Sequence, residues 1–267
     1  MTEEPLVRRE HHGPVCVLTM GYRPYNLVGP KLLGALTAEL KLGLEAGARA
    51  VLLCSSLRHF SAGADLDLFE SRSEAPPPAA AATTKSGRSS TVEFLRSFEL
   101  APVPIVASVH GVCLGGGFEL ALACDYVIAA KSAKIGSVEA TLGLQPLMGG
   151  IQRQVQRGGM ARAKEMSLLG RRYDPETLER WGMINLAVAD ELLESTAMTI
   201  AQELAHGPTL AHGATKQLAY IAANEGVLAA DEAMADIQKP IWASEDLKLG
   251  LASFRKNGPG MAKFVGR

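Results

Sequence analysis

The sequence has few cysteines and no excess of charge of either sign. Its four cysteines are spread over 267 residues without a Cys-x-x-Cys pair, which argues against a disulfide framework or a zinc site and favours buried thiols in a reducing compartment. Lys and Arg number 27 against 28 Asp and Glu, and the isoelectric point is near 6.6. The whole-chain charge therefore offers no general attraction for nucleic acid or anionic membrane, and we expect neither as a partner. The cysteines are Cys16, Cys54, Cys113 and Cys124.

Long apolar runs and a recognisable targeting segment are also missing. The longest stretch without Asp, Glu, Lys or Arg, residues 100–118, contains two prolines and a histidine as well as several glycines, and is a poor transmembrane helix. The N-terminal residues MTEEPLVRREHH are acidic at the start and lack the apolar core of a secretory signal. We therefore expect a cytoplasmic protein.

Strand-like and helical segments alternate over the first two thirds of the chain. This alternation predicts an α/β core with a parallel or mixed sheet, and the change to helical patterns after about residue 155 predicts a helical C-terminal part. Apolar segments typical of buried strands lie at 15–20, 48–54, 104–109 and 126–130, and an amphipathic helix is expected at 31–45. Later helices are expected at 160–169, 175–181, 190–206, 213–224, 228–238 and 244–256.

Residues 71–90 differ in composition from the rest of the chain. They contain three successive prolines and almost no large apolar side chain, which predicts a mobile loop. Such a loop is either a surface insertion or a flap near a ligand site, and composition alone favours the insertion.

A carboxylate, Glu119, lies inside the apolar run 118–123, directly after three consecutive glycines. This run predicts a helix that is buried on nearly all sides. An unpartnered buried carboxylate is costly, so it shifts its pKa, finds hydrogen bonds or serves chemistry. Two interpretations of Glu119 stay open, a salt-bridged core residue and a catalytic group.

Two glycine-containing turns follow predicted strands. Gly115, Gly116 and Gly117 open the helix of Glu119, and residues 59–69 follow the strand that ends near Cys54. Backbone N–H groups at such turns stabilise a developing negative charge, and two of them form an oxyanion hole. No P-loop, G-x-G-x-x-G or Gly-x-Ser-x-Gly pattern is present at these turns, which argues against a nucleotide site and a serine hydrolase. The glycines also suit simple close packing.

A second acidic residue, Glu139, follows the strand-like segment 134–136 near an expected helix start at Ser137. Taken alone it suits a first-turn glutamate that is favoured by the helix dipole. No cluster of His, Asp and Glu has the spacing of metal ligands, so we expect no metal site. His59 and His110 are expected to be structural, and Asp65 and Asp125 to hydrogen-bond nearby backbone.

The segments SAGAD (61–65), HGVCLGGGFELALACD (110–125) and GSVEATLGLQP (136–146) resemble, in order and spacing, the enoyl-CoA hydratase/isomerase (crotonase) superfamily. The resemblance covers nearly the whole chain. It implies a crotonase-like ββα-spiral α/β core with the acyl-CoA site in residues 1–195. It further implies a helical C-terminal trimerisation region in residues 196–267, and a homotrimer or a dimer of trimers.

The resemblance also implies roles for individual residues. Ala64 and Gly116 would donate backbone N–H groups to the thioester oxygen, and Glu119 and Glu139 would be the two catalytic carboxyls. In a hydratase, Glu119 as carboxylate would activate water for attack at C3, while protonated Glu139 would deliver a proton to C2. Coenzyme A would enter only as part of the thioester substrate, with no other cofactor. Its contacts would come from Ala62, Phe254, Arg23 and Lys256.

Two departures from the family pattern bear on activity. Family hydratases commonly have Pro-Gly-x-Gly-Gly where this chain has Pro146 to Gly150, so Leu147 replaces a glycine that lies against the catalytic water. Asp67 stands where a lysine is frequent. The resemblance therefore implies enoyl-CoA hydration first, with double-bond isomerisation or acyl-CoA hydrolysis as alternatives on the same scaffold. A non-catalytic acyl-CoA-binding protein is a further alternative, which the two retained glutamates argue against.

Overall fold

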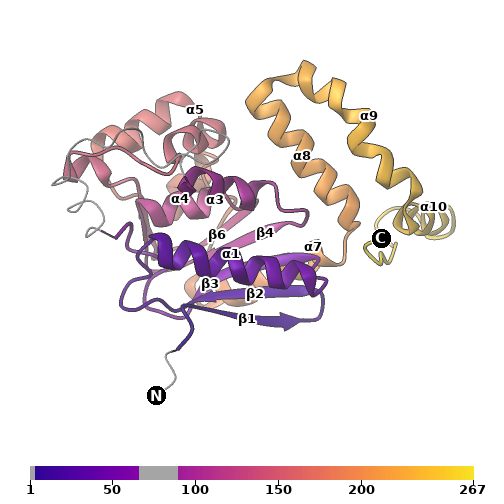
Figure 1. Cartoon of the computed structure of the whole chain (residues 1–267), viewed down its shortest axis with the longest axis horizontal. Coiled ribbons are helices and arrows are strands. Elements are labelled where there is room, and N and C mark those ends of the chain that lie inside the picture. Colours follow the sequence, from indigo (N-terminus) through magenta and orange to yellow (C-terminus); the bar gives the residue numbers. More distant parts are fainter. Residues whose placement is uncertain (1–3, 66–89) are drawn as a thin grey trace.

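A six-stranded mixed sheet forms the centre of the chain in the computed structural model, which describes residues 4–65 and 90–267 (Figure 1). The first strand pairs antiparallel with the second, and the other neighbouring pairs run parallel. The four predicted strands are confirmed, each within two residues of its predicted bounds. In spatial order the strands are β1 (Val7–His12), β2 (Val15–Met20), β3 (Ala50–Ser55), β4 (Ile105–Val109), β6 (Tyr126–Ala130) and β8 (Leu186–Val188).

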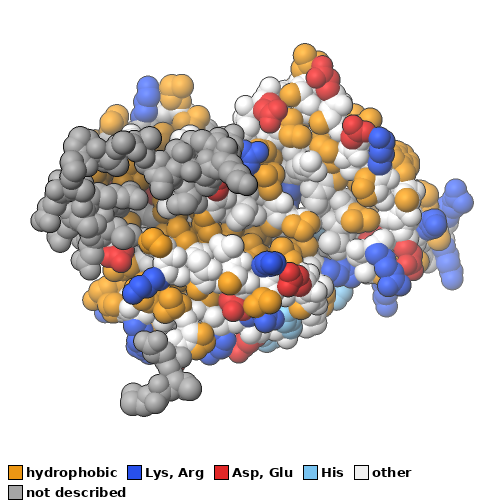
Figure 2. All heavy atoms as spheres, viewed as in Figure 1, with side chains coloured by type: hydrophobic (Ala, Val, Ile, Leu, Met, Phe, Trp, Pro, Cys, Tyr) orange, Lys and Arg blue, Asp and Glu red, His pale blue; other side chains and the backbone are white. Residues whose placement is uncertain are grey.

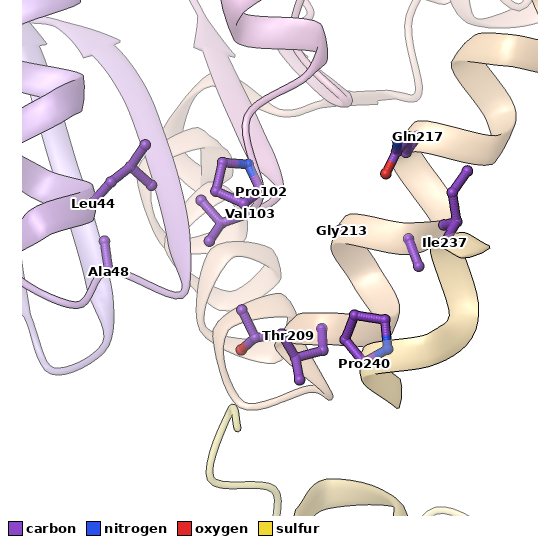
Figure 3. Close-up of a pocket in the computed structure, with 11 residues that line it drawn as sticks. Leu44, Ala48, Pro102, Val103, Thr209, Gly213, Gln217, Ile237 and Pro240 are labelled. Carbon is purple, nitrogen blue, oxygen red and sulfur yellow. The ribbon is translucent and has the colours of Figure 1, made fainter. Parts of the chain in front are cut away.

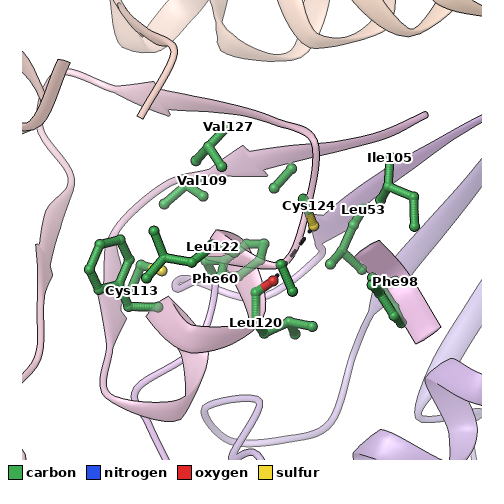
Figure 4. Packing of buried hydrophobic residues seen from close by; sticks show 14 of the residues in the cluster. Leu53, Phe60, Phe98, Ile105, Val109, Cys113, Leu120, Leu122, Cys124 and Val127 are labelled. Atoms are coloured by element: carbon green, nitrogen blue, oxygen red, sulfur yellow. Dashed lines mark hydrogen bonds between the residues drawn. The ribbon is translucent and has the colours of Figure 1, made fainter. Parts of the chain in front are cut away.

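Helices cover both faces of this sheet. Side chains alternate between the two faces of a strand, and along β2 Cys16 and Leu18 join one buried cluster while Val15 and Val17 join the other. The first cluster packs against α1 (Pro30–Glu45), α3 (Ser90–Glu99) and α4 (Gly116–Leu122). Figure 4 shows part of it, with Phe98 of α3 beside Leu53 and Ile105. Burial on both faces explains why the central strands are continuously apolar.

The opposite face of the sheet is covered by α7 (Leu193–Ala205). Its buried alanines, Ala197, Ala201 and Ala205, share a cluster with Val106 and Ile128 of the sheet, because small side chains let a helix lie close to a flat apolar surface. Thus α7 packs on the sheet, although the predicted boundary between the core (1–195) and the C-terminal region (196–267) falls within this helix. That division stays a prediction.

The edge strand β1 was not predicted, because its residues, VRREHH, are almost all charged or polar. Only Val7 among them is buried with the core, and the exposed side chains lie on an unpaired sheet edge. Charged residues on edge strands protect a sheet from pairing with another chain. An apolar pattern was therefore not to be expected there.

A small second sheet positions the two glycine-containing turns. It pairs β5 (Val112–Leu114) in parallel with β7 (Lys134–Gly136), of which only β7 was expected. Ser61 forms an isolated bridge with Cys113 of β5, and its carbonyl accepts the N–H of Leu114 at 3.1 Å. The turn at 61–64 therefore lies directly beside the start of α4.

The helical part after residue 150 begins earlier than predicted. α5 (Gly150–Leu169) contains the predicted helix 160–169 and an unpredicted first half, and the two halves meet at Gly159, whose φ of 78° and ψ of 166° are not helical. The first half carries buried Arg153 and Gln154, so it shows no simple apolar period. The remaining helices are η1 (Glu139–Leu142), α6 (Pro175–Arg180), η2 (Asp190–Leu192), α8 (Thr209–Glu225), α9 (Val227–Ala243) and α10 (Glu245–Asn257).

The predicted loop at 71–90 and Asp67 lie outside the described residues, apart from Ser90, which begins α3. Among the described residues, no helix is both long and apolar enough to cross a membrane. On the face drawn in Figure 2, acidic and basic side chains are interspersed rather than gathered by sign, in keeping with the nearly balanced composition.

The hairpin of α8 and α9 extends away from the sheet at the C-terminal end of the chain (Figure 1). A cavity of about 300 Å³ separates it from the core, lined by residues such as Ala48, Val103 and Ile237 (Figure 3). Ala48 and Val103 precede β3 and β4, so the cavity lies at the amino ends of these strands. The glycine-containing turns follow the carboxyl ends of the same strands, so the cavity and these turns lie at opposite ends of the strands.

One buried ion pair fastens α8 to the core. Lys216 donates to Asp125 at 2.6 Å and to the carbonyls of Val103 and Phe98 at 2.9 and 3.3 Å. Asp125 also accepts the N–H of Ile105 at 2.7 Å, as expected from the sequence. Burial raises the pKa of the Asp125 carboxyl, and the charge of Lys216 opposes this shift.

Lys216→Met is expected to lower the free energy of unfolding by ~3 kcal/mol, because it leaves a largely buried carboxylate and two carbonyls without their donor. Urea denaturation measures the loss. Lys216→Met combined with Asp125→Asn removes both charges and should recover more than half of it, since asparagine still accepts the Ile105 N–H. A double variant less stable than Lys216→Met would contradict this account.

Candidate active site

Glu119 lies at the centre of the site, in the first turn of α4. Only 2% of the residue is exposed. Its Oε1 accepts the backbone N–H of Gly150 at 2.7 Å and that of Met148 at 2.9 Å. These donors stand at the start of α5, where N–H groups have no partner within the helix and bind anions well. Within the described residues, Glu119 has no salt bridge that would explain its burial, but it has two backbone donors.

The pKa of Glu119 is raised from 4.5 to about 7, first by burial and then by the charge of Glu139. The N–H groups of Gly150 and Met148 and the charge of Arg153 act in the opposite direction. Arg153 is itself paired with Glu99 at 2.6 Å. A carboxyl with a pKa near 7 is well matched to proton transfer at neutral pH.

The backbone of Ala64 lies close to Gly116, three residues before Glu119. A Cβ placed on Gly116 would lie 3.7 Å from the nitrogen of Ala64. The backbone bonds around Ala64 are made by its neighbours, from Val28 N–H to the Gly63 carbonyl and from Asp65 N–H to the Val28 carbonyl. The Ala64 N–H has no acceptor in residues 4–65 and 90–267, and Gly116 begins α4, where N–H groups lack helical partners. Both N–H groups are therefore available to an acceptor that comes from outside the chain.

Glu139 begins the 3-10 helix η1, two residues later than the helix start expected at Ser137. A Cβ on Gly115 would lie 3.2 Å from its Oε1, so the carboxyl is close to the glycine turn. Both of its oxygens are buried, and neither has a hydrogen-bond partner in the described part of the chain. Burial raises the pKa of this carboxyl.

The two carboxyls thus have opposite environments. Hydrogen bonds from N–H groups stabilise a carboxylate, whereas a buried carboxyl without donors favours its protonated form. Oε1 of Glu119 accepts two such donors, whereas neither oxygen of Glu139 has a hydrogen-bond partner among the described residues. These hydrogen bonds favour the charged form of Glu119, while burial raises the pKa of both carboxyls. The pair can act as base and acid around a bound molecule.

The residues expected to hold coenzyme A fall into two groups. Ala62 and exposed Arg23 lie on one side of the site, because the Ala62 N–H donates to the carbonyl of Tyr25 at 3.0 Å. Phe254 and Lys256 lie on α10, at the far end of the chain from α4 and α5 (Figure 1). Phe254 is 60% exposed. The structure does not bring these two residues to the site of the same chain, so their predicted role requires a second protomer.

The histidines and cysteines have structural surroundings. His110 donates from Nε2 to the Leu57 carbonyl at 2.7 Å, and Nδ1 of His59 accepts the Val112 N–H at 3.2 Å. All four cysteines are free, three of them buried. Within the described ranges, no group of three His, Cys, Asp or Glu residues is placed to hold a metal ion.

The family pattern at Pro146 to Gly150 implies that position 147 lies against the catalytic water, but it does not show that the N–H groups of Met148 and Gly150 bind Glu119. Gly150 is needed there, since a Cβ on it would lie 2.6 Å from Cγ of Glu119. The signal was the pair Gly149–Gly150. A glycine at a helix start permits close approach of an anion, as the triple glycine does at α4.

Comparisons with known proteins agree with this arrangement. The family model described as Enoyl-CoA hydratase/isomerase matches residues 10–260. A Mycobacterium bovis protein named "Probable enoyl-CoA hydratase" is 32% identical over 94% of this chain and 95% of its own. The 1,2-epoxyphenylacetyl-CoA isomerase of Escherichia coli is 34% identical over 77% of this chain and 78% of its own. The crystal structure of an enoyl-CoA hydratase from Bacillus anthracis has a TM-score of 0.83 at 28% identity and covers 97% of this chain and 99% of that one.

The mixed sheet and the C-terminal helices match the crotonase fold of these relatives. The chain belongs to the enoyl-CoA hydratase/isomerase family, and its function is enoyl-CoA hydratase-like.

Proposed function

We propose that this chain catalyses the reversible addition of water to the double bond of a 2-enoyl-CoA thioester. The observation that carries the proposal is the unequal pair of buried carboxyls beside the backbone N–H groups of Ala64 and Gly116. Hydration needs these elements together, namely a base for water, an acid for C2 and donors for the enolate oxygen.

In the forward direction, the thioester oxygen accepts the N–H groups of Ala64 and Gly116. Glu119 takes a proton from water while the water oxygen bonds to C3 of the substrate. The double-bond electrons move toward the thioester, and the resulting enolate-like charge lies on the oxygen held by the two N–H groups. Glu139 then gives its proton to C2, and the product is a 3-hydroxyacyl-CoA. The proton balance is restored by exchange between the two glutamates and solvent.

The wider setting is part of the same proposal. Ala62 and Arg23 would contact the coenzyme A moiety of the substrate, and no other cofactor takes part in these steps. Phe254 and Lys256 would reach it from a neighbouring protomer, which a homotrimer or a dimer of trimers would supply. Four free thiols suit a reducing compartment, so the cytoplasm remains the predicted location.

Leu147 favours double-bond isomerisation as a second candidate activity. Its side chain is 42% exposed, and it directly precedes Met148, whose N–H binds Glu119. A leucine at the position where the family pattern has a glycine against the catalytic water would reduce the room for that water, whereas isomerisation moves a proton between carbons and needs no water. The description of the matching family model, Enoyl-CoA hydratase/isomerase, is in keeping with this alternative.

An assay on both substrate types separates the two activities. We expect the purified protein to remove the absorbance of a conjugated 2-enoyl-CoA, with a mass gain of one water. Leu147→Gly is expected to raise the hydration rate about tenfold, equivalent to ~1.4 kcal/mol of barrier, and Leu147→Ala to raise it less. Conversion of a 3-enoyl-CoA to the conjugated isomer, with the conjugated substrate left unchanged, would replace hydration by isomerisation.

A further inference from the structure

A second buried polar group lies next to the carboxyl pair. Gln154, on the first half of α5, is 0% exposed. Its Nε2 donates to Oγ of Ser137 at 2.6 Å, and its Oε1 accepts from Oγ of Ser167 at 3.3 Å. Ser137 is also fully buried. Burying an amide is costly unless it is hydrogen-bonded, and a leucine of similar size would fill the same space, so packing alone does not account for this side chain.

The position of Gln154 on its helix connects it to both glutamates. It follows Gly150 by four residues, and residues at this spacing lie on the same face of a helix. Gly150 donates its N–H to Glu119, and one turn later Gln154 donates to Ser137, two residues before Glu139. One helix face therefore contacts the first carboxyl directly and the side chain of Ser137, two residues before the second.

Glu139 depends on such indirect support, because its own oxygens have no partner in the part of the chain that the structure describes. Its backbone is held on one side by the N–H of Leu144, which donates to the Glu139 carbonyl at 3.0 Å. On the other side Gly136, at the end of β7, accepts the N–H of Gly115 at 2.9 Å. Between these supports, Ser137 bonded to Gln154 joins the turn to α5.

We propose that Gln154 is a positioning residue, which through Ser137 sets the location of the Glu139 carboxyl relative to Glu119 and the oxyanion donors. The effect of Gln154 on catalysis rests on the proposed function, whereas its effect on the position of Glu139 does not depend on any reaction. Gln154 also links the two halves of α5 across the break at Gly159, since Ser167 lies beyond that break. The amide thus fixes three segments around one catalytic group.

The first test measures the pKa of Glu119 by NMR of ¹³C-labelled glutamate, and needs no substrate. Glu139→Gln removes the neighbouring charge, so the pKa of Glu119 in this variant is the reference for a Glu119 that no longer interacts with Glu139. If Gln154 holds Glu139 in place, Gln154→Leu should move the pKa of Glu119 toward this reference. Gln156→Leu makes the same chemical change on the same helix, where Gln156 bonds exposed Asn224, and should leave the pKa unchanged.

The second test follows hydration of a 2-enoyl-CoA in D2O. Gln154→Leu should lower kcat about 10–100-fold with KM within about threefold, since small displacements of a catalytic group are costly. Each hydration adds one deuterium to C2. In this variant the label should be divided between the two stereochemical positions at C2, whereas the wild type and Gln156→Leu should label one position. Ser137→Ala should give the same pattern, and the double variant should be no worse than either single one. If Gln154→Leu fails to fold, Ser137→Ala carries both tests.

The outcomes separate the two ideas. A wild type that hydrates no 2-enoyl-CoA overturns the proposed function, and the Glu119 titration then decides the role of Gln154. An unchanged Glu119 pKa together with wild-type kcat and C2 labelling in a folded Gln154→Leu variant would overturn the positioning role and leave hydration intact. A lower melting temperature alone, with these readouts unchanged, would count against it in the same way.

Discussion

Glu119→Gln is expected to lower kcat by about 10³-fold, within the range that general acid–base groups contribute, while the fold is retained. Glutamine keeps one oxygen, and Oε1 of Glu119 is the single atom that accepts both the Met148 and Gly150 N–H groups. The structural hydrogen bonds therefore survive in the variant, and only the capacity to take a proton from water is lost. Steady-state kinetics on a 2-enoyl-CoA measures the effect. Glu45→Gln, at an exposed position on α1, is the matched control.

The same variant should be more stable than the wild type at alkaline pH. The folded pKa of Glu119 is raised from 4.5 to about 7, so the folded state holds this proton more tightly than the unfolded state does. Below about pH 4.5 both states are protonated and burial of the group costs no charge. As pH rises through 7 the folded state must carry a buried charge, and stability is lost. At about 1.4 kcal/mol per pKa unit, Glu119→Gln should be ~3 kcal/mol more stable at pH 8.

Urea denaturation at pH 5 and pH 8 tests this pH dependence, and the gain should be small at pH 5. The wild-type kcat/KM should rise with pH through about 7 as Glu119 loses its proton. If Glu119→Gln gains no more stability over the wild type at pH 8 than at pH 5, burial does not raise the pKa of Glu119 in the folded protein. Retained activity would remove Glu119 from the base role.

The parts of the fold that the sequence predicts are those where one physical pattern dominates. The strand at 15–20 lies between two apolar layers, and every residue in it is buried. Glu119 was identifiable because a charge inside an apolar run has few explanations. In contrast, charged β1 lies on an edge, and the first half of α5 mixes buried Arg153 and Gln154 with exposed residues. Neither segment has a period that would indicate its structure.

The site was predictable only in part for a related reason. A side chain that acts is visible in the sequence, but a backbone N–H is not, because every residue except proline has one. The donors from Met148 and Gly150 to Glu119 depend on where α5 begins, and the role inferred for Gln154 depends on the distance to Ser137. Such contacts between residues that are distant in sequence appear only when the chain is folded.

Gly116→Ala is expected to lower kcat about 10²–10³-fold, the usual cost of losing one oxyanion donor, with little change in melting temperature. The added methyl group would lie 3.3 Å from Cβ of Val28, 3.5 Å from Sδ of Met148 and 3.7 Å from the Ala64 nitrogen. Small shifts of flexible side chains relieve the first two contacts, so the fold should tolerate it. The space beside the Ala64 N–H, however, is where the proposed mechanism places the thioester oxygen.

Gly34→Ala is the matched control for this substitution. Gly34 is exposed on α1, and a Cβ there would meet nothing within 4 Å, so the variant should keep full activity. Glu119 and Glu139 are unaltered in both variants, and their pH profile should remain that of the wild type. A Gly116→Ala enzyme with wild-type kcat would mean that the thioester oxygen binds elsewhere. The carboxyl pair would then need a different partner for the negative charge that its chemistry creates.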